Sequence, residues 1–147
     1  MKKNRQAFVL VLNEKNWYKI VEQSQSGQRS QVFFRKNSVA PVSTGKLLFY
    51  VKKPIKEILG SADFIERKTG DRDELWREFG KESCFESYNE YLDFIEDQQT
   101  VTVVRFSNFR ILEAPVSADE FRRLIGLPIA PRGGRYLDFE QIQKLLQ

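Results

Sequence analysis

Apolar and polar positions form short runs along this chain, and the runs predict alternating strands and helices. Stretches of apolar, β-branched and aromatic residues too short for helices predict buried strands, and two longer stretches predict long strands. The expected strands cover residues 6–12, 31–36, 46–51, 55–68 and 100–112. Gly60, inside the fourth of them, predicts a bulge or sharp bend that lets a sheet curl toward closure.

Helical spacing appears between these strands. Trp17, Ile20 and Val21 recur as on one face of an amphipathic helix. The segments "DRDELWREFG" and "SYNEYLDFIED" have the same spacing, and Ser87 with Glu90 fits a capping box at the start of the second. Two more short helices are expected in "SADEFRRLIG" and "FEQIQKLL".

The order of the elements predicts the fold class. Without a strict strand–helix–strand rhythm, we expect an α+β fold with a small, strongly curved or closed mixed sheet and flanking helices. The alternative is an open sheet covered on one face. The 147 residues, of which 41% are hydrophobic, predict one domain over 1–147 with an acidic helical insertion at about 71–98.

Targeting signals are not evident in the sequence. No apolar run approaches the length of a membrane span, and the apolar stretch near the start is too short for a secretory signal. We therefore expect a cytoplasmic protein without a membrane partner.

The net charge of +4 conceals a strong separation of charge along the chain. Residues 1–59 hold 12 Lys and Arg against 3 Asp and Glu, whereas residues 60–99 hold 5 against 12. A basic face of this kind attracts polyanions, because it neutralises phosphates and releases their counterions. The alternative is that the charges only solvate the surface.

Common catalytic and metal-binding patterns are missing from the sequence. There is no histidine, and Cys84 is the only cysteine, which excludes an intramolecular disulfide and a zinc site of thiolate and imidazole ligands. A phosphate-binding loop ending in "TGK" would need glycine at Ala40. Carboxylates between residues 63 and 97 have the spacing of solvated helix faces. We expect no catalytic residue, metal or cofactor.

Basic segments interleaved with aromatic residues remain: "RSQVFFRK", "FYVKKPIK" and "APRGGRYL". Nucleic-acid-binding proteins use this combination, because cations hold the backbone while aromatic rings stack on bases. The phosphate-binding residues predicted are Arg29, Arg35, Lys36, Arg132 and Arg135. Gly133 and Gly134 would let a ligand come close, and Tyr50, Tyr136 and Phe33 would form a stacking platform. The alternative places both Phe33 and Phe34 in the core and makes the glycine pair a plain turn.

The quoted segments also carry a family resemblance. The strand "AFVLVL", the helix after it, the strand "VFFRK" and the passage "STGKLLFYVKKPIKEILGSADF" resemble the PUA-like superfamily. The end "GGRYLDFEQIQKLL" and the acidic insertion are similar to an uncharacterised archaeal branch related to ASCH and EVE domains. The resemblance covers nearly the whole chain. It implies a small mixed-sheet pseudo-barrel with flanking helices, RNA binding, and in related branches recognition of modified bases and a few enzymes.

The ASCH pattern also bears on catalysis. Enzymatic members, as the resemblance implies, carry G-x-K-x-x-T-x-R, whose lysine acts on the substrate. Aligned from Gly27, this chain has Arg29 in place of the lysine and Val32 in place of the threonine. Because arginine stays protonated and cannot act as nucleophile or base, the pattern disfavours this chemistry.

The sequence therefore predicts a domain that binds RNA, or a nucleic acid such as DNA carrying a modified base. The cleft would lie beside "RSQVFFRK" and "APRGGRYL". One alternative is a small ASCH-type hydrolase or ribonuclease that uses Glu57 or Glu66. A third possibility is a protein-interaction module recruited through the acidic helices.

Overall fold

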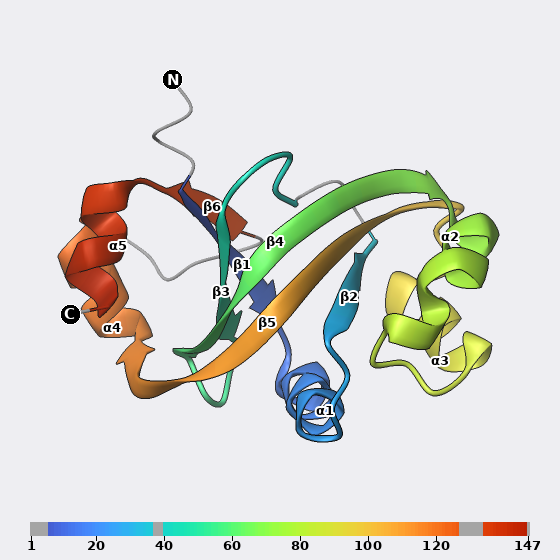
Figure 1. Cartoon of the computed structure of the whole chain (residues 1–147), viewed down its shortest axis with the longest axis horizontal. Coiled ribbons are helices and arrows are strands. Elements are labelled where there is room, and N and C mark those ends of the chain that lie inside the picture. The colour runs from blue at the N-terminus through green and yellow to red at the C-terminus, as the bar shows by residue number, and fades with distance from the viewer. Residues whose placement is uncertain (1–5, 37–39, 127–133, 147) are drawn as a thin grey trace.

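The computed structural model describes residues 6–36, 40–126 and 134–146 of the chain. Figure 1 shows long curved strands at the centre with helices around them. The elements in chain order are β1 Ala7–Leu12, α1 Glu14–Gln25, β2 Ser30–Arg35, β3 Lys46–Val51, β4 Glu57–Asp71, α2 Arg72–Phe79, η2 Gly80–Glu82, α3 Tyr88–Ile95, β5 Thr100–Ser117, α4 Ala118–Ile125, β6 Gly134–Leu137 and α5 Phe139–Leu146.

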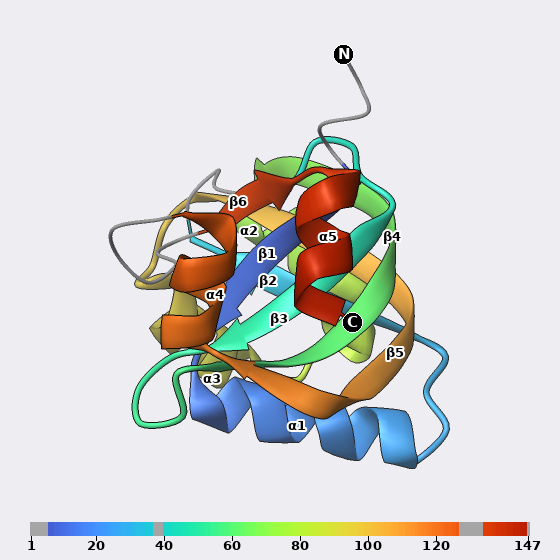
Figure 2. The same cartoon turned by 90° about the vertical axis from the view of Figure 1, so that its left-hand side faces the viewer.

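One mixed sheet contains all six strands in the order β2-β5-β4-β3-β1-β6. β1 and β3 are parallel, and the other neighbouring strands are antiparallel. β4 and β5 curve strongly along their length (Figures 1 and 2), and their register shifts at three places. One shift lies between Ile58 and Gly60, so the predicted bulge is confirmed. The predicted α+β fold with a small, curved mixed sheet is confirmed as well.

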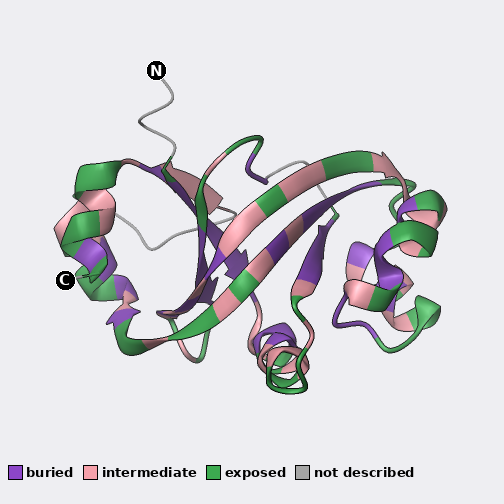
Figure 3. Ribbon diagram, in the orientation of Figure 1, coloured by how far each residue is buried: buried purple, intermediate pink, exposed green. Residues whose placement is uncertain are grey.

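Side chains on opposite faces of the sheet enter two separate cores. Phe8, Leu10 and Leu12 of β1 point into the larger core, whereas Val9 and Val11 belong to the smaller one, as the two-residue period of a strand requires. The smaller core is covered by α4 and α5, which lie beside β1 and β3 in Figure 2. β1, β2 and β3 are therefore almost entirely buried, whereas long stretches of β4 and β5 are partly buried or exposed, as Figure 3 shows.

The helices between β4 and β5 cover β2 through aromatic side chains. The ring of Phe34 lies 4.7 Å from that of Tyr91 and 6.4 Å from those of Trp76 and Phe85. Val32 also forms a parallel bridge with Ser83. The outer edge of β2 is therefore attached to the segment that the sequence identified as an acidic insertion.

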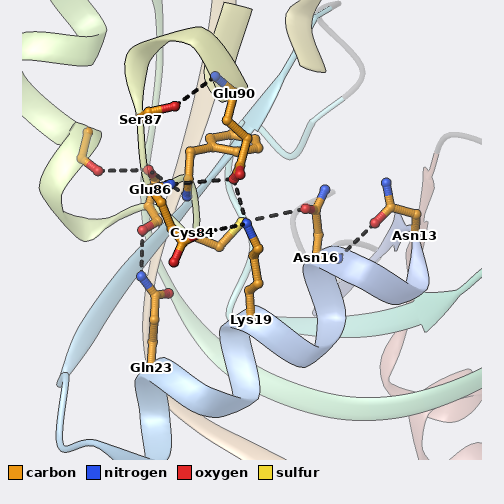
Figure 4. A network of polar contacts seen from close by, with 11 residues as sticks. Asn13, Asn16, Lys19, Gln23, Cys84, Glu86, Ser87 and Glu90 are labelled. Atoms are coloured by element: carbon orange, nitrogen blue, oxygen red, sulfur yellow. Dashed lines mark hydrogen bonds and ion pairs between the residues drawn. The ribbon is translucent and has the colours of Figure 1, made fainter. Parts of the chain in front are cut away.

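Polar contacts connect the same segment to α1 (Figure 4). The Lys19 ammonium lies 2.6 Å from a carboxylate oxygen of Glu90, and the Gln23 amide donates to the Ser83 carbonyl at 2.5 Å. The buried Cys84 thiol donates to the Asn16 side chain at 3.8 Å. Burial raises the pKa of Cys84 to about 11, so the thiol stays protonated near neutral pH and has a structural role.

The predicted helix starts agree with the structure. The hydroxyls of Ser87 and Ser117 accept hydrogen bonds from the backbone N–H groups three residues later, both at 3.1 Å. Asp138 and Gln141 accept from each other's backbone N–H groups. These side chains satisfy donors that a helix leaves unpaired in its first turn.

The strand β6 was not expected. It begins at the second of two consecutive glycines, shortly after a proline, a composition typical of a turn. In the structure, Gly134–Leu137 pairs with β1 in antiparallel register. The partner strand, rather than local propensity, therefore determines this element.

Within the described ranges, no helix combines the length and apolar character needed to cross a membrane. The cytoplasmic location stays a prediction.

Gly60 provides a test of the close packing at the bend. A Cβ atom there would lie 2.6 Å from the Trp17 ring and 2.9 Å from the Arg110 carbonyl oxygen. We expect Gly60→Ala to lower the free energy of unfolding by about 1–3 kcal/mol, because the backbone cannot yield easily. Gly70→Ala is the control, since its nearest neighbour would lie at 4.0 Å. Equal stability of the two variants in chemical denaturation would contradict this account of the bend.

Candidate nucleic-acid interface

The end of β2 and the start of β6 approach each other along β1. The pairing of β6 with β1 ends at Leu10 and Gly134. One residue further, the Val11 carbonyl accepts a hydrogen bond of 3.1 Å from Nη1 of Arg35 at the end of β2. We call this junction of β1, β2 and β6, with Arg35, Gly134 and Tyr136, the seam.

Tyr136 attaches the loop after β2 to the seam. Its hydroxyl accepts a hydrogen bond of 2.7 Å from the backbone N–H of Val42. Its ring packs edge-on against Phe8, with the ring centres 5.1 Å apart. The ring is half-buried, so part of its surface remains accessible to a ligand.

Gly134 lets the backbone come close to β1. It has a φ of +140°, and a Cβ atom there would lie 2.5 Å from the Phe8 ring. Both observations favour glycine at this position. The predicted close approach therefore occurs within the protein itself.

Arg35 places a positive charge in the seam. Only 8% of the residue is exposed, and burial lowers the pKa of its guanidinium from the ordinary value. The ordinary pKa of an arginine lies so far above neutral pH that the guanidinium remains charged even after this lowering. A buried cation interacts with an anion more strongly than an exposed one, because water screens the interaction less. The seam is thus suited to bind a phosphate or another anion.

Phe33 is not an exposed stacking ring, which corrects the sequence-based prediction. It is 2% exposed, and its ring packs edge-on against Phe94 at 5.7 Å. Phe34 is also fully buried, against Tyr91. Both faces of β2 are covered, because the insertion helices pack where an open face was expected. The alternative that places both rings in the core is the correct one.

Tyr50 and Tyr136 lie on opposite faces of the sheet. Tyr50 is 3% exposed and belongs to the smaller core, whereas Tyr136 packs against the larger one. Burial, and to a lesser extent Asp119, raises the pKa of Tyr50. The two rings therefore do not form the single platform that was predicted. Arg135, opposite Val9, lies on the same face as Tyr50 and is half-buried.

The remaining predicted residues lie apart from the seam or outside the described residues. Arg29 lines a hollow of about 420 Å³ at the other end of β2, with Gln28 and Asn108. Lys36 forms an ion pair of 2.7 Å with Glu96. Arg132 and Gly133 lie outside the described residues. Of the predicted set, Arg35, Gly134 and Tyr136 are thus the residues attached to the same stretch of β1, through Val11, Leu10 and Phe8.

A polar cluster beside β2 was not predicted. The Arg105 guanidinium binds both carboxylate oxygens of Glu82 at 3.0 Å, and the Ser30 hydroxyl donates to the same carboxylate. Burial alone would raise the pKa of Glu82, but these two partners outweigh it and hold the pKa below its ordinary value. No local pattern predicts this cluster, because its members lie far apart along the chain.

Carboxylates of the insertion neutralise cations of the remaining chain. In each of four ion pairs, the insertion supplies the acid, and α1, a strand of the sheet or the residue directly after β2 supplies the base. The pairs are Glu90–Lys19, Glu96–Lys36, Glu78–Lys68 and Glu82–Arg105. The acidic and basic segments that are separate in the sequence therefore form ion pairs with each other where the insertion packs on the sheet and α1.

Exposed lysines on the turn between β3 and β4 were missed as site residues. Lys52, Lys53 and Lys56 lie in the basic segment "FYVKKPIK", from which only Tyr50 was selected. Within the described ranges, no three side chains of the His, Cys, Asp and Glu types gather as metal ligands.

Comparisons with known proteins point to one family. No protein-family model matches the chain. An ASCH domain-containing ribonuclease from Zymomonas mobilis subsp. mobilis is 25% identical over 130 residues, which are 88% of this chain and 86% of that protein.

Solved structures agree in fold. A serine-to-alanine variant of the Zymomonas mobilis ASCH protein matches with a TM-score of 0.79 and 25% identity, over 97% of this chain and 95% of that chain. The crystal structure of the ASCH protein itself matches with a TM-score of 0.77 and 24% identity, over 96% of this chain and 94% of that chain. An NMR structure of a protein from Rhodopseudomonas palustris matches with a TM-score of 0.55 and 11% identity, over 96% of this chain and 90% of that chain. The placement in an archaeal branch stays a prediction.

Truncation of Phe33 tests its assignment to the core. We expect Phe33→Ala to lower the free energy of unfolding by about 3–5 kcal/mol, because it leaves a cavity. Phe139→Ala is the control, since Phe139 is 59% exposed. Binding of a labelled single-stranded RNA, per folded molecule, should not change. A stable Phe33→Ala protein with weakened RNA binding would contradict the assignment.

Proposed function

We propose that this chain, which belongs to the PUA-like superfamily and has the fold of an ASCH domain, binds single-stranded RNA at the seam. The buried, charged guanidinium of Arg35 carries the proposal, because it offers a fixed donor to a phosphate. The half-buried ring of Tyr136 offers a surface for a base, and base stacking on an aromatic ring is sequence-tolerant.

The chemistry of the seam suits a single strand better than a duplex. Arg35 is 8% exposed, so only a narrow, flexible anion reaches its guanidinium. A single strand can turn a phosphate inward and place an unpaired base beside Tyr136, which a base-paired duplex cannot do without opening. DNA carrying a modified base is the other nucleic acid to which this reasoning applies.

Replacement of Arg35 tests the proposal. We expect Arg35→Gln to weaken binding of a labelled single-stranded RNA roughly fivefold at 0.1 M salt, because loss of one phosphate contact lowers the salt slope by about 0.7. Arg77→Gln, which removes the same charge from the exposed face of α2, should leave the slope unchanged. Circular dichroism at the assay temperature would establish that both variants are folded. Equal slopes for Arg35→Gln and the unchanged protein would refute a phosphate contact at Arg35.

Ribonuclease activity is the second candidate, and the similarity to the ASCH domain-containing ribonuclease over 88% of this chain favours it. Cleavage through the ribose 2′-hydroxyl needs a group that removes its proton, and the chain has no histidine for this task. Glu57 begins β4 directly after the β3–β4 turn. Glu66 instead lies 3.8 Å from the Arg105 guanidinium. Glu57 is therefore the better candidate for a base.

A quenched fluorescent RNA and a DNA of the same sequence would test the second candidate. A ribonuclease that uses the 2′-hydroxyl should cut the RNA and leave the DNA intact. Glu57→Gln should slow cleavage about a hundredfold or more without weakening binding, whereas Glu66→Gln should change the rate little. No cleavage of RNA by the purified protein would remove this candidate and leave RNA binding in place.

A further inference from the structure

Three lysines project from a turn whose backbone is fixed at several points. Lys52, Lys53 and Lys56 are all exposed and connect β3 to β4. The Lys52 N–H donates to the Leu12 carbonyl at 3.0 Å, and the Lys56 carbonyl accepts from Ala118 at 2.9 Å. A third bond of 3.1 Å, from the Ile55 N–H to the Lys52 carbonyl, closes the turn itself. The lysine side chains therefore extend from a backbone whose position is fixed by hydrogen bonds.

Within the described ranges, the three lysines lack acidic partners. Among the residues that the structure describes, no carboxylate forms an ion pair with any of the three. The acids at the start of the adjacent α4 have partners within that helix: Asp119 pairs with Arg122 at 2.5 Å, and Glu120 with Arg123 at 3.7 Å. Lys19, Lys36 and Lys68, in contrast, pair with carboxylates of the insertion.

The turn and the seam meet at neighbouring residues of β1. The Val11 carbonyl accepts from Arg35 of the seam, and the Leu12 carbonyl accepts from the Lys52 backbone. Because consecutive carbonyls of a strand point to its opposite edges, the seam and the turn flank the end of β1. One chain of nucleotides that passes across this end can contact both.

We propose that Lys52, Lys53 and Lys56 bind successive phosphates of the RNA strand whose other contact is the seam, an inference that rests on the proposed function. An unpaired lysine loses no ion pair when it binds a phosphate, and each contact releases condensed counterions from the strand. The turn thus adds phosphate contacts to the one that Arg35 makes at the seam, and Tyr136 contacts a base.

Because the cations of the turn are lysines and not arginines, the turn is expected to contribute affinity for RNA but no sequence selectivity. Lysine acts as a point charge on a flexible stem and lacks the planar fork that arginine offers to a base edge or a phosphate. Contacts to phosphates position a strand but carry no direct sequence information. The turn should therefore raise the affinity for all RNA sequences equally and should not select among them.

A pair of charge-matched triple variants tests the inference. The first carries Lys52→Gln, Lys53→Gln and Lys56→Gln. The control carries Lys46→Gln, Lys68→Gln and Lys144→Gln, of which the first two remove lysines that pair with Asp63 and Glu78. Both variants lose three positive charges, so any effect of net charge alone is the same. Binding of a labelled single-stranded RNA is measured by fluorescence anisotropy over a range of salt concentrations.

We expect the turn variant to lower the slope of log affinity against log salt by about 2, since each phosphate contact contributes about 0.7. Near 1 M salt the turn variant and the unchanged protein should bind RNA with similar affinity, because the charges are screened. A slope that differs by about 2 then makes the binding of the variant roughly a hundredfold weaker at 0.1 M salt. The control variant should retain the slope of the unchanged protein. RNAs of different sequence should lose affinity by the same factor.

Other outcomes separate this inference from the proposed function. Equal losses in both triple variants would overturn the inference, because net charge would explain them. A turn variant with an unchanged slope, beside an Arg35→Gln variant with a reduced one, would overturn the inference and retain RNA binding at the seam. If the unchanged protein binds no RNA at all, the proposed function and the inference both fail.

Discussion

The hydrogen bond from the Arg35 guanidinium to the Val11 carbonyl connects the two sides of the curved sheet. In the described part of the chain, β1 and β2 are not neighbours in the sheet, so no backbone ladder joins them. The long, bulged strands β4 and β5 bring these two strands together, and a side chain then spans the junction. A charge held in this way interacts strongly with an anion. The feature that closes the sheet is therefore also the one suited to hold a phosphate.

The insertion determines which basic residues remain open. Its carboxylates pair with lysines and an arginine of α1, β4, β5 and the residue directly after β2, and its aromatic rings cover β2. Exposed ion pairs contribute little to stability, but they lower the positive potential on that side. In the described part of the chain, the lysines of the β3–β4 turn have no such partner, and this turn lies away from α2 and α3 in Figure 1.

Most of the fold was predictable because local signals and tertiary packing agree. The periodicity of β1 to β5, the bend at Gly60 and the caps at Ser87 and Ser117 are local features that the structure retains. β6 was not predictable, because only its pairing with β1 makes it a strand. The binding site was predictable in part. The sequence shows that Phe33 and Phe34 point to opposite faces, but not that distant helices cover both faces.

Photocrosslinking of the purified protein to a single-stranded RNA that carries 4-thiouridine tests the central claim most directly, because it locates the bound strand on the chain. Mass spectrometry of the digested complex would identify the crosslinked peptides. The account predicts crosslinks in the peptides that contain Tyr136 and the end of β2. Crosslinks confined to α2 and α3, or to the hollow beside Arg29, would contradict an RNA-binding seam.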